Sequence, residues 1–107
     1  PAANPTPSAE PTPRTVRVLY RVNPLVGNPA GVAVLYADTS EQMRDVVVTP
    51  PWLLEIEGKT GATMLLVATN DNEGTLVGCE ILVDGVLLSS ERQTSEGSDL
   101  VCVVDLE

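Results

Sequence analysis

Residues 76–93 read LVGCEILVDGVLLSSERQ and contain the strongest hairpin signal in the chain. Asp84-Gly85 separates two segments rich in branched apolar residues, 76–83 and 86–93. An Asp-Gly pair suits the two-residue turn of a β-hairpin, because both residues adopt positive φ angles with little strain. This region therefore predicts two antiparallel β-strands joined by a tight turn.

Further short strands are expected on both sides of this hairpin. Their ranges are 15–22, 31–38, 43–58, 61–69 and 99–106. Residues 23–31 form a turn-rich loop, and Pro50-Pro51 divides 43–58 into two pieces, because proline cannot donate a hydrogen bond within a central strand. Residues 40–47 are too short and too rich in β-branched side chains to hold a helix alone. The pattern predicts an all-β fold, an immunoglobulin-like β-sandwich of about seven strands.

Alternating apolar residues along the first two strands indicate the faces that point inward. They are Val16, Val18, Tyr20, Val22, Val32, Val34 and Tyr36. Nominally outer positions are apolar as well, at Leu19, Leu35, Leu82, Leu87, Val101 and Val103. These outer residues reflect either strand curvature with loop cover, or a docking patch for a protein or an acyl chain. We take Leu82 and Leu87 as candidate contacts for a partner or lipid.

The only tryptophan, Trp52, follows the proline pair directly. Its large ring fits one of two roles. It either plugs the end of the sandwich as part of the core, or it stands out as an anchor for a partner or a lipid. Trp52 is therefore a third candidate contact residue.

The two cysteines, Cys79 and Cys102, lie at core-facing strand positions, on the faces of Ile81 and Leu100 respectively. A bond between them would close a loop of about 24 residues and stabilise the fold by about 3 kcal/mol. Two buried free thiols are the alternative. Because a disulfide persists only in an oxidising compartment, the predicted bond indicates an extracytoplasmic domain.

Charge is unevenly distributed along the chain, whose formal net charge is −9. Residues 1–22 hold Arg14, Arg17 and Arg21 against Glu10, a net +2, which leaves −11 for residues 23–107. Such an acidic body repels phosphate backbones, so we expect no binding to nucleic acid. The basic beginning is either a solvated strand face or a site of attraction to anionic lipid headgroups.

Catalytic motifs are not found in this sequence. It has no histidine, which excludes Ser-His and Cys-His catalysis, and no CxxC motif for a metal or redox centre. GKTG at 58–61 lacks phosphate-loop spacing, because Leu53 occupies the first glycine position, and we interpret it as a hairpin turn. Asn70–Gly74 is interpreted as a turn, and Glu55 and Glu57 as a solvated strand face. We expect no enzymatic activity, no metal and no cofactor.

The beginning of the chain, residues 1–14, holds five of the nine prolines and no large apolar side chain. Such a segment cannot offset its ordering entropy by burial, so we expect a disordered or polyproline-like linker or stalk. A ragged chain end is the alternative. The composition changes sharply at Thr15, and we place the β-sandwich domain at residues 15–107. Any leader or membrane helix would precede Pro1.

Five segments follow one another over residues 16–104: VLYRV, AGVAVLYAD, PPW, GCEILVDGV and VCVV. In this order they resemble the C-terminal domain of the MmpS family of mycobacterial membrane proteins. The most specific elements are Pro51-Trp52 and the run Cys79-x-Ile81-x-Val83-Asp84-Gly85 with the later Cys102. The chain departs from the resemblance at Glu80, where a basic or uncharged polar residue is expected, and in the richness of its linker in proline.

The resemblance implies a short cytoplasmic N-terminus, one membrane helix in the inner membrane, a linker and an extracytoplasmic β-sandwich with a disulfide between the matching cysteines. It also implies partnership with an MmpL-type transporter of the resistance-nodulation-division class, which exports lipids or siderophores. We therefore expect a non-catalytic accessory domain of such an exporter, with lipid or siderophore cargo as a possible ligand. A stand-alone secreted or lipid-anchored ligand-binding β-sandwich is the alternative.

Overall fold

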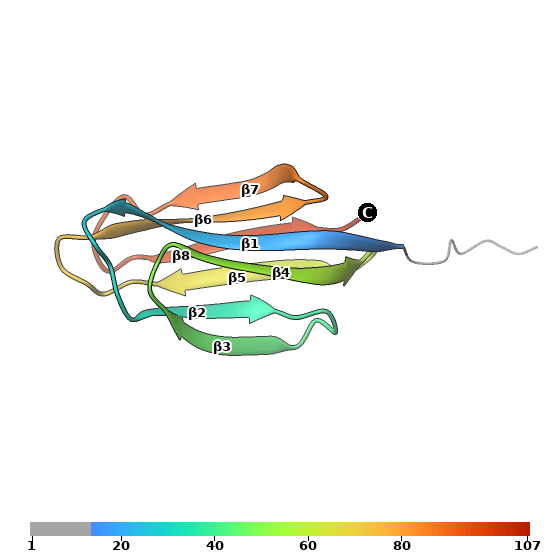
Figure 1. Cartoon of the computed structure of the whole chain (residues 1–107), viewed down its shortest axis with the longest axis horizontal. Coiled ribbons are helices and arrows are strands. Elements are labelled where there is room, and N and C mark those ends of the chain that lie inside the picture. Colours follow the sequence, from blue (N-terminus) through green and yellow to red (C-terminus); the bar gives the residue numbers. More distant parts are fainter. Residues whose placement is uncertain (1–13) are drawn as a thin grey trace, which may run out of the picture.

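The computed structural model describes residues 14–107, so the predicted linker over residues 1–13 lies outside the described part of the chain. The described residues form eight strands. They are β1 (Thr15–Val26), β2 (Val32–Ala37), β3 (Met43–Val48), β4 (Trp52–Lys59), β5 (Thr63–Thr69), β6 (Leu76–Val83), β7 (Val86–Arg92) and β8 (Asp99–Asp105). The strands pair into two antiparallel four-stranded sheets (Figure 1), which confirms the predicted β-sandwich.

The order of strands within the sheets is β4-β1-β6-β7 and β3-β2-β5-β8. The second order matches the C′-C-F-G sheet of an immunoglobulin domain, and the β4-β1 pair of the first corresponds to strands E and B. The hairpin of β6 and β7 takes the side of β1 where an immunoglobulin domain has its first strand. This hairpin lies between β5 and β8 in the chain, and the eight strands correspond to the segments predicted from the sequence, one more than the approximate seven of the predicted sandwich.

The hairpin at Asp84-Gly85 forms as predicted. Both residues have positive φ, 50° and 84°, as a two-residue turn of this type requires. The carboxylate of Asp84 also accepts a hydrogen bond from the backbone N–H of Arg17 at 2.9 Å, and the N–H of Asp84 donates to the carbonyl of Arg17 at 2.8 Å. The turn is therefore attached to the beginning of β1.

The space between the sheets is filled by one hydrophobic core. Val18, Tyr20 and Val22 of β1 are fully buried, which confirms the inward face predicted for this strand. Cys79 of β6 and Cys102 of β8 are also fully buried and form a disulfide, with their Cα atoms 6.3 Å apart. Since β6 and β8 belong to different sheets, this bond covalently joins the two layers of the sandwich. The predicted disulfide is confirmed.

The first strand is longer than predicted, because the loop expected at 23–31 begins only after Val26. β4 ends its pairing with β1 at Val22, so beyond that residue one edge of β1 is open. Pro24, which has no N–H to donate, lies in this open stretch, where β1 pairs with β6 through a bulge before Val26. The strand can therefore continue through a proline.

Two smaller predictions at the beginning of β1 and the end of β4 need correction. The GKTG segment at 58–61 is a turn but not a hairpin, because β4 and β5, which it connects, belong to different sheets.

Arg14, which the sequence placed in the linker, is hydrogen bonded to the sandwich. Its N–H donates to Oγ1 of Thr60 and its carbonyl accepts from the N–H of Thr60, both at 2.9 Å.

The connections lie at two opposite ends of the sandwich (Figure 1). The end at which residue 14 enters also holds the turns β2-β3, β4-β5 and β6-β7 and the C-terminus. We call it the proximal end. The other end, the distal end, holds the loops β1-β2, β3-β4, β5-β6 and β7-β8. Pro50-Pro51 separates β3 from β4, which confirms the predicted division of 43–58. This break lies at the distal end.

Candidate interaction surfaces

The outer surface of the β3-β2-β5-β8 sheet is apolar across all four strands, and we call it the apolar face. Strand pairing aligns Leu35 of β2 with Val67 of β5, and Val67 with Val101 of β8. The adjacent row places Leu65 opposite Val103. The outward apolar residues that define the face are Ala33, Leu35, Met43, Val47, Leu65, Val67, Val101 and Val103.

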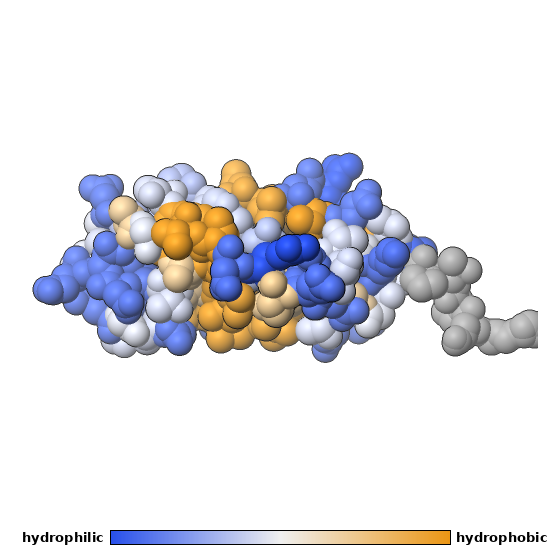
Figure 2. Space-filling model, turned by 90° about the horizontal axis from the view of Figure 1, so that it is seen from below, coloured by the Kyte–Doolittle hydropathy of each residue, from blue (hydrophilic) through white to orange (hydrophobic). Residues whose placement is uncertain are grey.

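Several of these side chains are strongly exposed. Val47 is 71% exposed, and Val101 and Val103 are each 50% exposed. Figure 2, which looks at the side of the molecule that carries β3, shows hydrophobic surface over the middle, interrupted by a strongly hydrophilic strip, and hydrophilic surface at both ends. Branched side chains exposed to this degree, in register on neighbouring strands, form a contiguous patch and not isolated surface residues.

Acidic residues border the apolar face. The outward positions of its four strands include Asp45, Asp99 and Asp105, and none of these positions holds a lysine or arginine. Asp45 lies opposite Leu35, and Asp99 opposite Thr69. Asp105 accepts a hydrogen bond of 2.7 Å from the hydroxyl of Thr63. The face thus combines an apolar centre with a margin of one sign of charge.

The outer surface of the β4-β1-β6-β7 sheet has mixed charges, and we call it the charged face. Nε of Arg17 lies 3.2 Å from Oε2 of Glu55, and Nη2 of Arg21 lies 2.8 Å from Oε1 of Glu80. The same Glu80 oxygen accepts a hydrogen bond of 3.1 Å from the side-chain amide of Asn23. Both arginines of β1 are therefore paired with glutamates of neighbouring strands.

An apolar row crosses the charged face, and Leu53 of β4, which is 58% exposed, lies apart from it beside Arg21. Pairing places Leu19 opposite Leu82, and Leu82 opposite Leu87. On the other side of Leu19 lies Glu55 of β4. An open groove of about 800 Å³ runs along this row, lined by Arg17, Leu19, Glu55, Glu57, Leu82 and Asp84 among others. Glu55, which the sequence placed on a solvated strand face, is ion-paired with Arg17 on the strand surface.

The six outward apolar residues identified in the sequence do not form one patch. Leu19, Leu82 and Leu87 belong to the charged face. The others, Leu35, Val101 and Val103, belong to the apolar face on the opposite side of the sandwich. Alternation within a strand identifies an outward side chain but not which sheet the strand joins, so the single-patch hypothesis is wrong. The sequence also missed Val47, the most exposed apolar residue of the apolar face.

Trp52 packs into the sandwich at the edge where β3 and β4 lie. Its side chain is half-buried and contacts the core, and its ring centroid lies 6.0 Å from that of Tyr36, which is 5.7 Å from that of Tyr20. These tilted contacts favour the core interpretation over an exposed anchor. A role for Trp52 in contacting a partner stays a prediction.

The distal loops are joined by buried amide side chains that the sequence did not identify. Asn70 is 1% exposed, and its amide donates to Oγ1 of Thr75 at 3.0 Å and to Oε1 of Gln93 at 3.2 Å. Asn72 donates to the carbonyl of Ala30 at 2.7 Å. The Asn70–Gly74 segment is thus a turn whose polar groups bind the protein itself. No cluster of three or more Cys, Asp or Glu side chains suited to a metal ion occurs within residues 14–107.

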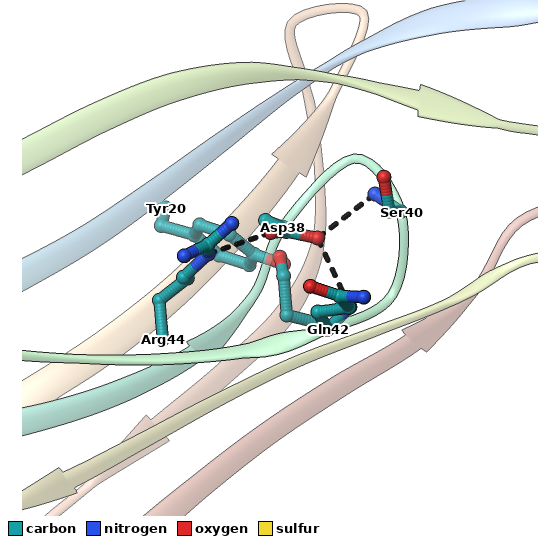
Figure 3. Close-up of polar contacts among 6 residues, drawn as sticks. Tyr20, Asp38, Ser40, Gln42 and Arg44 are labelled. Atoms are coloured by element: carbon teal, nitrogen blue, oxygen red, sulfur yellow. Dashed lines mark hydrogen bonds and ion pairs between the residues drawn. The ribbon is translucent and has the colours of Figure 1, made fainter.

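The β2-β3 turn at the proximal end is held by Asp38 (Figure 3). Its Oδ1 accepts the N–H groups of Ser40 and Gln42 at 2.8 and 3.0 Å, and its Oδ2 lies 2.7 Å from Nε of Arg44. The hydrogen bond from Arg44 and those from the two N–H groups lower the pKa of Asp38 below its ordinary value. Asp followed two residues later by Ser is a turn signature that could have identified this site.

Tyr20 lies beneath the same turn and is fully buried. Its hydroxyl donates a hydrogen bond of 2.6 Å to the carbonyl of Ala37. Burial raises the pKa of the Tyr20 phenol well above its usual range, so the group is neutral and serves as a donor. Tyr20 therefore ties β1 of one sheet to β2 of the other, which is a structural role.

Comparison with known proteins identifies the family of the chain. A family model described as "Mycobacterium membrane protein" matches residues 3–106. No curated protein matches significantly. Within residues 14–107, no helix has the length and apolar character needed to cross a membrane. Because the matching model spans nearly the whole sequence, the chain belongs to this mycobacterial membrane protein family, the MmpS-type family that its sequence resembles.

Proposed function

We propose that this chain is a non-catalytic accessory domain of an MmpL-type exporter of the resistance-nodulation-division class. The observation that carries the proposal is family membership over residues 3–106, combined with an exposed apolar sheet face on the folded domain. An apolar patch of this kind is typical of surfaces that bind another macromolecule. The exported substrate would be a lipid or a siderophore, as the family resemblance implies.

The proposed location is extracytoplasmic, on an anchor in the inner membrane. The Cys79–Cys102 disulfide supports this location, because such bonds persist in oxidising compartments. The chain enters the sandwich at the proximal end, so an anchor ahead of it would be attached at the end opposite the distal loops. The net charge of −11 over residues 23–107 makes nucleic acid an unsuitable partner.

A second candidate function is a stand-alone secreted or lipid-anchored ligand-binding module. The groove of about 800 Å³ on the charged face favours it, because its volume falls within the range of small-molecule sites. Leu82 lines this groove, and Leu87 pairs with Leu82 beside it. Both remain proposed contact residues. A bound lipid or siderophore would protect their side chains from solvent.

The sequence that precedes Pro1 in the gene separates the two functions. An apolar helix of about 20 residues would support an anchored accessory protein. A cleaved signal peptide ending at a lipid-modified cysteine would support the stand-alone module.

The direct test is co-purification of the protein, expressed with its natural upstream sequence, with a co-expressed MmpL-type transporter in mild detergent. We expect a stable complex and loss of export when the protein is deleted. Normal export without the protein, together with no complex, would refute the accessory function.

A further inference from the structure

We propose that the apolar face is the docking surface of the domain, and that its occupant is a protein surface with an apolar centre and basic margins. This inference rests on the proposed function, because it assigns the surface through which the accessory domain contacts its transporter. It selects the apolar face over the Leu82 and Leu87 row of the charged face.

The extent of the apolar face is the first argument. Its apolar residues come from all four strands of the sheet and occupy three successive rows. With strands about 4.8 Å apart and outward residues about 6.8 Å apart along each strand, the area is on the order of 400 Å². This size is that of the largest patch on a typical monomer, which is often functional.

The chemistry of the outward side chains is the second argument. On the charged face, Arg17 pairs with Glu55 and Arg21 with Glu80, so both arginines of β1 are neutralised within the domain. On the apolar face, Asp45, Asp99 and Asp105 have no cation among the outward residues of the same sheet. Lysine or arginine residues of a partner would complement this margin and orient the encounter.

The same margin argues against a second copy of this chain as the occupant. Stacking two apolar faces would bring two sets of aspartates together at the rim, within bodies that each carry −11 over residues 23–107. Like charges placed across an interface oppose association. The acidic margin therefore disfavours self-association of the apolar face and favours a partner with a basic margin.

The shape of the face argues against an acyl chain. Sites for small ligands enclose most of the ligand surface in a cleft or cavity. Val101 and Val103 are each 50% exposed on the outer surface of one sheet, and the groove of about 800 Å³ lies on the opposite face, beside Glu55 and Asp84. An open apolar sheet surface is complementary to the apolar side of a helix or sheet of another protein.

The experiment measures how three variants, each with two or three substitutions, bind to a co-expressed MmpL-type transporter. Each variant is expressed with the upstream sequence of the protein. Val101→Thr with Val103→Thr makes the β8 side of the apolar face polar and keeps the side-chain shape. Asp45→Asn with Asp99→Asn and Asp105→Asn removes the marginal charge. Leu82→Thr with Leu87→Thr makes the competing apolar row of the charged face polar. Thermal unfolding of each variant checks that it is folded.

The valine variant should bind at least about tenfold more weakly. The aspartate variant should lose affinity at low salt and show a flatter dependence on salt concentration, whereas the leucine variant should bind normally. Full binding by the folded valine variant, or loss confined to the leucine variant, overturns the inference and leaves the accessory function standing. Failure of the unsubstituted protein to bind overturns both.

Two further measurements exclude the other occupants. Sedimentation of the protein at high concentration should show a monomer, and a dimer broken by Val101→Thr would overturn the proposed partner. Phosphatidylglycerol vesicles should not bind the apolar face. Binding to vesicles that is lost in the valine variant would assign the face to lipid and contradict the proposal.

Discussion

The two outer faces of the sandwich are each formed by four strands, but their polar residues are arranged differently. On the charged face, arginine and glutamate side chains alternate with leucines and pair with each other across strands. On the apolar face, valine and leucine side chains lie in adjacent rows, and the acidic residues stand at the margin. On the charged face, both arginines of β1 already have carboxylate partners within the domain. On the apolar face, the acidic margin has no cation among the outward residues, so this face is suited to a partner that supplies one.

The covalent link between the layers should give the largest effect on stability. Cys79→Ala with Cys102→Ala removes the bond that holds β6 of one sheet to β8 of the other. We expect the free energy of unfolding to fall by about 2–5 kcal/mol, as for the loss of native disulfides in small domains. Chemical denaturation of the variant and the parent measures this. Equal midpoints would show that packing alone holds the faces in place.

Two neighbouring leucines of β5 offer a matched comparison between core and apolar face. Leu66 is fully buried, whereas Leu65 points outward to the apolar face. Leu66→Ala should lower the free energy of unfolding by about 2–5 kcal/mol through cavity formation. Leu65→Ala should cost less than about 1 kcal/mol and should instead weaken binding to the transporter. A larger loss of stability from Leu65→Ala would mean that this face is part of the core.

Two ion pairs of the charged face should differ in strength. The side chains of Arg21 and Glu80 are 33% and 22% exposed, and those of Arg17 and Glu55 are 73% and 55% exposed. Arg21→Met, which keeps the aliphatic stem, should destabilise the domain by about 1 kcal/mol, because Glu80 loses a charged partner. Arg17→Met should change stability by less than about 0.5 kcal/mol. Equal effects would show that burial does not distinguish the two pairs.

The smallest effect concerns pH and the Asp38 turn. Because the folded pKa of Asp38 is lowered below its ordinary value of 3.8, its contribution to stability is present above that value. The contribution is lost as the pH falls through the folded pKa. Asp38→Asn should therefore give a shallower decline of stability below about pH 4 than the parent protein. Parallel pH profiles for the two proteins would contradict a role for this carboxylate.

Local sequence was sufficient to predict the strands, the Asp84-Gly85 hairpin and the disulfide. Alternation indicated the inward side of β1, β2, β6 and β8, and two inward cysteines in a small domain favoured a bond. The extension of β1 through Pro24 was missed, because it depends on where β4 stops pairing with β1. The sequence around Pro24 does not show that β4 ends before it, because that depends on how the strands pair in the sheet.

The interaction surfaces could be predicted only in part. Exposed apolar positions were found residue by residue, but their grouping depends on the order of strands in each sheet. Leu82 and Val101 are both outward, yet strand pairing puts them on opposite faces. The buried Gln93 was not found either, because a glutamine at the end of a strand normally faces water, whereas here it bonds to Asn70 of another loop.

The most direct test of the account is a footprint of side-chain methyl groups in the complex. The protein, with methyl-labelled valine and leucine, is observed by NMR with a soluble paramagnetic agent before and after the MmpL-type transporter is added. We expect Val101, Val103 and Val47 to become protected from the agent, while Leu82 and Leu87 stay exposed. Protection of Leu82 and Leu87, with the valines unchanged, would contradict the claim that this domain docks through its apolar face.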